Sequence, residues 1–146
     1  MWALVLTMLF KSCTSSYANA NQVQVDYSIF RQWVVAELVE DGATIQLGFG
    51  GTINALAAEL KDKRGLGIHT EAMSDAAMEL LRCGAADNSC KAIHPGKTIA
   101  TFAYGSKRMY DYSDHNPSVA ILPVDYVNNP YTIAQNDNVV SVNAAL

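Results

Sequence analysis

The chain has 146 residues, of which 50% are hydrophobic and 16% are charged, and its formal net charge is −4 at pH 7. This length is typical of a single domain with one hydrophobic core, and the apolar content excludes a disordered chain. The acidic balance argues against a nucleic-acid-binding surface, which needs clustered Lys and Arg. The three cysteines form neither a CxxC pair nor an even disulfide set, so we expect reduced thiols.

An apolar run opens the chain. Residues 2–10 have the length of a signal-peptide core, and the Ala-Asn-Ala triplet at 18–20 fits a small-x-small cleavage pattern. No positive side chain precedes the run, and it is too short to span a bilayer as a helix, so we expect no membrane association. We therefore set residues 1–21 apart as a signal-like or non-homologous segment. Cleavage would predict secretion, and retention would predict a cytoplasmic or mitochondrial protein.

Helical and strand patterns alternate along the rest of the chain. Gly42 and Gly84 are suited to end two helices, and Ser74 is suited to cap the start of one. The predicted helices are 27–40, 52–63, 76–83, 106–112 and 129–135, and the predicted strands are 43–47, 66–69, 98–104, 119–127 and 139–142. This alternation predicts an α/β fold with a mainly parallel sheet and flanking helices.

Two polar features fall where ligands bind in parallel sheets, at the carboxyl ends of the strands. The first is the loop from Gly48 to Thr52, which follows a strand and opens a helix, so that its backbone N–H groups can face an anion. It matches neither a Walker A loop nor GxGxxG, and a tight turn without a ligand is an equal reading. The second is Glu71, 23 positions after Gly48, whose carboxylate could be a base, a metal ligand, a nucleophile or a solvated side chain.

Histidine positions give little support for a metal site. His69 has no HxH or HxxxH partner, and neither does His94. His69 precedes Glu71 by two residues and could orient a substrate, although a structural role is the more common one. We expect no metal and no Ser or Cys nucleophile, because no GxSxG elbow or Cys–His pair is present.

Several longer segments are similar to a known family. From about Val23 to the end the chain resembles the acetyl-CoA hydrolase/transferase family, especially its 4-hydroxybutyrate and butyrate CoA-transferase branch. The segments that carry this resemblance, in chain order, are LVEDGATIQLGFG, ELKDKRGLGIHTEAMSD, HPGKTIATFAYGSKRMYDY, NPSVAILPVDYVNNP and VSVNAAL. The resemblance implies that residues 22–146 form part of the CoA-transferase-like C-terminal domain.

The resemblance implies a covalent mechanism. Glu71 matches the family's nucleophile, which attacks an acyl-CoA to give an acyl-glutamyl anhydride and then a glutamyl-CoA thioester. A short-chain carboxylate as acceptor gives CoA transfer, whereas water gives acyl-CoA hydrolysis. Coenzyme A is then a substrate, and no tightly bound cofactor is implied.

The resemblance also implies the surrounding site. The residues Gly48, Phe49, Gly50, Gly51 and Thr52 match the family's CoA-binding loop. The departures from the commonest family residues are Phe49, Gly51, Thr52 and Ile53. Asn128 matches an asparagine near the nucleophile.

The resemblance covers about six-sevenths of this chain but only the middle of a typical family member. We therefore expect a fragment, which would act with complementary segments or as a homo-oligomer. The alternative is a noncatalytic CoA-binding remnant. We also expect residues 139–146 to form an exposed sheet edge.

Overall fold

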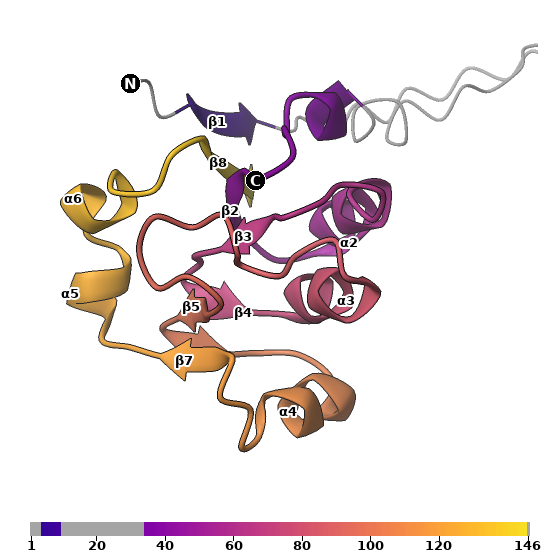
Figure 1. The fold of residues 1–146 in the computed structure, drawn as a ribbon. Coiled ribbons are helices and arrows are strands. Elements are labelled where there is room, and N and C mark those ends of the chain that lie inside the picture. Colours follow the sequence, from indigo (N-terminus) through magenta and orange to yellow (C-terminus); the bar gives the residue numbers. More distant parts are fainter. Residues whose placement is uncertain (1–3, 10–33, 146) are drawn as a thin grey trace, which may run out of the picture.

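The computed structural model describes residues 4–9 and 34–145, and parallel strands form its centre (Figure 1). Four strands are hydrogen-bonded in the order β1 (Leu4–Leu9), β8 (Val139–Ala145), β2 (Thr44–Leu47) and β3 (Gly67–Ile68). Two further pairs join β5 (Thr98–Ala100) to β7 (Val119–Ile121) and β4 (Ala72–Met73) to β6 (Phe102–Ala103). All strand pairs in the described part are parallel, which confirms the predicted α/β fold.

β8 is an inner strand of the sheet. β1 pairs with it from Leu4↔Val140 to Leu9↔Ala145, and β2 pairs with its other side from Thr44↔Val139 to Leu47↔Val142. The prediction of an exposed edge at residues 139–146 was therefore wrong, because residues from the N-terminal apolar run cover that edge. The remainder of the segment 1–21 lies outside the described residues.

Two nine-residue helices, α2 (Gly51–Glu59) and α3 (Asp75–Cys83), lie on one side of the strands (Figure 1). The Ser74 hydroxyl accepts a hydrogen bond from Ala77 N at the start of α3, and Gly84 ends α3 with φ 81°, as predicted. Apolar side chains of both helices and of β2 form the core between them: Ile45, Leu47, Ile53, Leu56, Met78 and Leu80. Burial of these side chains is the main term that stabilises the sheet.

Three short helices complete the described part: α4 (Lys107–Ser113), α5 (Val124–Val127) and α6 (Pro130–Ile133). α5 and α6 lie on the side of the strands opposite α2 and α3 (Figure 1). Residues 34–37 are helical, and the earlier part of the predicted helix 27–40 lies outside the described residues. None of the described helices is both long enough and apolar enough to cross a bilayer.

The predicted strand 119–127 was wrong in its second half. The observed strand, β7, ends at Ile121, and helix α5 begins after Pro123. The N–H groups of Tyr126 and Val127 both donate to the Pro123 carbonyl, which closes the first turn of this helix. Proline fixes its own φ and suits a helix start, so this residue changes the direction of the chain.

The predicted strand 98–104 is divided into β5 and β6. The division occurs because the Glu71 carbonyl accepts hydrogen bonds from both Thr101 N (2.8 Å) and Phe102 N (3.2 Å). The pairing partner thus changes from β7 to β4 within this segment.

Lys91 packs against β3. A Cβ at Gly67 would come within 2.4 Å of Lys91 Cγ, so the glycine permits this close approach. The Lys91 ammonium is buried and donates to the carbonyls of Ile68 (3.0 Å) and Lys97 (2.6 Å). Burial lowers the pKa of Lys91 to about 8.

Candidate active site

The glycine-rich loop joins the end of β2 to the start of α2. Gly50 has φ 108°, a conformation that favours glycine, and it forms the N-cap of α2 without any side-chain cap. The first N–H groups of α2 therefore have no side-chain partner at this end. Phe49 is exposed and its ring lies 6.2 Å from that of Phe102 and 5.5 Å from that of Tyr104.

Glu71 stands between β3 and β4, directly before Ala72 of β4, in a backbone that is held on both sides. Its carbonyl accepts from Thr101 N and Phe102 N, and the N–H of the preceding Thr70 donates to Ile99 O (3.0 Å). The Glu71 side chain is exposed and makes no ion pair with any described residue. A fixed backbone thus presents an uncompensated carboxylate at the carboxyl end of the sheet.

Thr70 attaches this segment to the end of β2. Its buried hydroxyl donates to Leu47 O (3.0 Å) and accepts from Leu47 N (3.4 Å). Leu47 immediately precedes the glycine-rich loop, so one threonine sets the spacing between Glu71 and that loop.

His69 attaches the same segment to the last residue of α5, Val127. Its Nε2 donates to the Val127 carbonyl over 2.8 Å, and Val127 immediately precedes Asn128. The imidazole is 4% exposed, and burial is the main cause that lowers its pKa below the ordinary value. We infer the neutral tautomer with hydrogen on Nε2, because a carbonyl can only accept. Nδ1 is buried and has no partner among the described residues.

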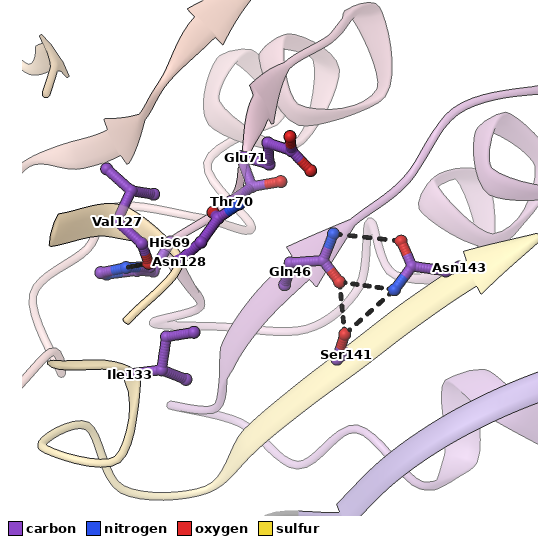
Figure 2. Close-up of a pocket in the computed structure, with 9 residues that line it drawn as sticks. All are labelled: Gln46, His69, Thr70, Glu71, Val127, Asn128, Ile133, Ser141 and Asn143. Atoms are coloured by element: carbon purple, nitrogen blue, oxygen red, sulfur yellow. Dashed lines mark hydrogen bonds between the residues drawn. The ribbon is translucent and has the colours of Figure 1, made fainter. Parts of the chain in front are cut away.

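These contacts bring Glu71 and Asn128 to one pocket of about 250 Å³ (Figure 2). A second pocket, of about 190 Å³, also includes Glu71 and lies against Gly48 and Phe49. The full lining of the first pocket is Gln46, His69, Thr70, Glu71, Val127, Asn128, Ile133, Ser141 and Asn143, and that of the second is Gln46, Leu47, Gly48, Phe49, Glu71, Ala72 and Asn143. Neither lining contains Lys or Arg.

Four of the expected site residues line these pockets: Glu71 lines both, Asn128 lines the first, and Gly48 and Phe49 line the second. The other three, Gly50, Gly51 and Thr52, stand at the start of α2 and line neither of these two pockets.

Three pocket residues were missed by sequence reasoning: Gln46, Ser141 and Asn143. Their side chains form one hydrogen-bonded group across β2 and β8 (Figure 2). A signal was present, because inner parallel strands are usually apolar on both faces, whereas the segments TIQL and VSVN carry polar residues at alternate positions.

No group of three or more His, Cys, Asp or Glu side chains in the described part is arranged to hold a metal ion. His94 bonds instead to the Tyr126 hydroxyl (2.7 Å), and His115 pairs with Asp114.

Comparison with known proteins identifies the family to which the chain is similar. Residues 105–146 match the model of the acetyl-CoA hydrolase/transferase C-terminal domain. The chain is 52% identical over 112 residues to a succinyl-CoA:cyclohexane-1-carboxylate CoA transferase of Geobacter metallireducens, covering 77% of this chain and 26% of that protein. It is 50% identical over 111 residues to a 4-hydroxybutyrate coenzyme A transferase of Clostridium kluyveri, covering 76% of this chain and 26% of that protein.

A solved structure shows the same fold. The crystal structure of 4-hydroxybutyrate CoA-transferase from Porphyromonas gingivalis superimposes with a TM-score of 0.77 at 40% sequence identity, covering 80% of this chain and 30% of that one. The chain thus spans about a quarter of the length of the curated relatives it matches.

Proposed function

Because the chain belongs to the acetyl-CoA hydrolase/transferase family, we propose that Glu71 is the covalent nucleophile of a CoA-transferase active site. The observation that carries the proposal is the position of Glu71, whose side chain borders both pockets at the carboxyl end of the sheet. A nucleophile that passes an acyl group and CoA in turn needs space on two sides. The proposal assigns residues 22–146 to the family domain.

In the proposed reaction, a Glu71 carboxylate oxygen attacks the thioester carbon of an acyl-CoA. The C–S bond breaks, CoA leaves as a thiolate, and Glu71 carries a mixed anhydride. The thiolate then attacks the Glu71 carbonyl of that anhydride, which forms a glutamyl-CoA thioester and releases the carboxylate of the first acyl group. A second carboxylate reverses both steps and leaves as its CoA thioester.

The surroundings of Glu71 support this assignment. The carboxylate makes no described ion pair that would withdraw it from a substrate, and its backbone is fixed by Thr101 and Phe102. The Gly48–Phe49 side is accessible to CoA, and free N–H groups at the start of α2 would favour an anionic ligand. On the other side, the Asn128 carboxamide would donate to charge that develops on the acyl oxygen.

We propose acyl-CoA donors and short-chain carboxylate acceptors as substrates. The relatives named above act, by their names, on succinyl-CoA, cyclohexane-1-carboxylate and 4-hydroxybutyrate. The first pocket contains Val127 and Ile133 beside its polar residues, a lining suited to a short acyl chain. CoA acts as a substrate throughout, with no cofactor required by the chemistry.

The test is formation of the covalent adduct. The full chain is incubated with acetyl-CoA or butyryl-CoA and examined by intact mass, with Glu71→Gln as the variant and Glu59→Gln, an exposed glutamate at the end of α2, as the matched control. We expect a CoA adduct in the wild type and in Glu59→Gln, removable by hydroxylamine, and none in Glu71→Gln. Both substitutions should leave the free energy of unfolding within about 0.5 kcal/mol, because the side chains are exposed.

An adduct that survives in Glu71→Gln, or no adduct with any acyl-CoA, would contradict the proposal. Formation of the adduct itself releases one acid per chain, so continued, multiple-turnover release of free acid without a carboxylate acceptor would indicate hydrolysis by the same nucleophile. Binding of CoA without any adduct would indicate a noncatalytic CoA-binding chain.

A further inference from the structure

We infer that Gln46 is an additional catalytic residue, whose carboxamide N–H donates to the oxyanion that forms when Glu71 attacks the thioester. Ser141 and Asn143 are its positioning residues. This inference rests on the proposed role of Glu71 and adds to it a donor that stands on the strand facing Glu71 across both pockets.

The first observation is that the two pockets share three residues. Gln46, Glu71 and Asn143 line both, whereas Asn128 belongs only to the first and Gly48 only to the second. The shared residues therefore mark the passage from the loop side to the acyl side. A thioester whose sulfur lies on the loop side and whose acyl chain lies in the first pocket has its carbonyl group at this passage.

The second observation is the register of the strands. Gln46 of β2 is paired directly with Ser141 of β8, and Asn143 lies two residues further along β8, on the same face. Ile45 and Leu47, the neighbours of Gln46 in sequence, point into the core instead. Three polar side chains on one face of two inner strands thus converge at the carboxyl end of the sheet.

The third observation is how the carboxamide is held. Gln46 Oε1 accepts from the Ser141 hydroxyl and from Asn143 Nδ2 (2.9 Å), and Gln46 Nε2 donates to Asn143 Oδ1 (3.2 Å). Asn143 Nδ2 also contacts Ser141 Oγ (3.2 Å). These bonds occupy the Gln46 oxygen but only one of its two N–H groups. Figure 2 shows the Gln46 nitrogen on the side of Glu71 and its oxygen toward Ser141.

The fourth observation concerns Gly48, which follows Gln46 by two residues on the same face of the strand. A Cβ at this position would lie 2.8 Å from Asn143 Oδ1 and 3.4 Å from Asn143 Cα. Any side chain here would displace the asparagine that holds Gln46. The glycine therefore leaves room for the paired amides, a role separate from the conformational freedom needed at Gly50.

A donor in this position would act on the transition state. As the Glu71 oxygen bonds to the thioester carbon, the electron pair of the carbonyl moves onto its oxygen, and it returns when the C–S bond breaks. A hydrogen bond from a carboxamide already held by two partners strengthens as that charge develops and needs no reorganisation. Neither lining contains Lys or Arg, so an uncharged side chain has to supply the hydrogen bond, and Gln46 has an N–H group that none of its described bonds occupies.

The test compares variants in single-turnover adduct formation by the full chain with acetyl-CoA. Gln46→Met removes the donor, and Gln46→Glu keeps an acceptor oxygen for the Ser141 hydroxyl and Asn143 Nδ2 while it removes the N–H. Ser141→Ala removes one positioning bond. Gln135→Met is the matched control, because Gln135 is exposed beyond α6 and its side chain bonds only to Tyr131 O among the described residues.

We expect Gln46→Met and Gln46→Glu to lower the maximal rate of adduct formation on the order of 10²-fold, with the half-saturating acetyl-CoA concentration little changed. Ser141→Ala should lower the rate roughly five-fold, and Gln135→Met should not change it. The thermal midpoint of Gln46→Glu shows whether the fold is retained, so this variant carries the test if Gln46→Met fails to fold.

Three outcomes overturn the inference, and they can be told apart. If the adduct depends on Glu71 but forms in both Gln46 variants at the wild-type rate, the role of Gln46 is excluded and the proposed role of Glu71 stands. A rise in the half-saturating acetyl-CoA concentration with an unchanged maximal rate would also exclude this role for Gln46, since it indicates a contribution to substrate binding in the ground state. The absence of any Glu71-dependent adduct in the wild type would overturn both this inference and the proposed function.

Discussion

His69 donates from Nε2 to the Val127 carbonyl over 2.8 Å, and this bond joins two segments that are 58 residues apart in sequence. One segment continues to Glu71 and the other to Asn128. Thr70 makes the corresponding link to Leu47, ahead of the glycine-rich loop. The two residues that precede Glu71 thus connect it to both sides of the pocket.

We predict that the His69 contact depends on pH. Because burial lowers the pKa of folded His69, the unfolded chain takes up the proton first, below about pH 6.5. The contribution of neutral His69 to the free energy of unfolding is therefore complete above that pH and is lost as the pH falls toward the folded pKa. The slope for this one group is no more than about 1.4 kcal/mol per pH unit. Urea denaturation between pH 7.5 and 5 should show this loss in the wild type.

His69→Gln should remove that pH-dependent component, because glutamine can still donate to Val127 O but does not titrate. His69→Leu should cost about 1–3 kcal/mol at pH 7, since it leaves the carbonyl without a donor. His115→Gln, at a side chain that is 92% exposed, is the control and should behave as the wild type does. An unchanged pH profile in His69→Gln would contradict the prediction.

A second prediction concerns two glycines of the same loop. Gly48→Ala should cost about 1–3 kcal/mol, because the new Cβ would meet Asn143 Oδ1 at 2.8 Å. Gly51→Ala should be neutral or slightly stabilising, since no atom lies within 4 Å of a Cβ there and its φ is not positive. Thermal denaturation of both variants measures the difference. Equal midpoints would show that Asn143 moves aside without cost.

A third prediction concerns Lys91 in alkaline solution. Its pKa is about 8 in the folded chain and 10.5 at the ordinary value, so the unfolded chain holds more protons between these limits. Stability should therefore rise with pH from about 8 to 10.5, by no more than about 1.4 kcal/mol per pH unit for this group.

Urea denaturation at pH 8, 9 and 10 tests this, with the change in Lys91→Met subtracted from that in the wild type. Lys61→Met, at an exposed position, is the matched control. If the free energies of unfolding of the wild type and Lys91→Met change in parallel with pH, the prediction that Lys91 has a lowered pKa in the folded chain is contradicted.

Much of the fold could be predicted from local patterns. Ser74 and Gly84 mark the ends of α3 because capping depends on single residues, and the alternation of helices and strands predicted the parallel sheet. The division of 98–104 could not be predicted, because it depends on a carbonyl 30 residues away, at Glu71. The helix at Val124–Val127 was missed because its β-branched residues favour a strand, although Pro123 was visible.

Local patterns in the sequence predict the alternating elements and the glycine loop, and the family resemblance identifies Glu71 and Asn128 as candidates. That Glu71 and Asn128 share a pocket, and that Gln46, Ser141 and Asn143 form its opposite wall, follows from the packing of strands distant in sequence. The physical reason is strand register. Local sequence records which residues share a face of one strand, but pairing between β2 and β8, 95 residues apart at Gln46 and Ser141, decides which polar side chains meet.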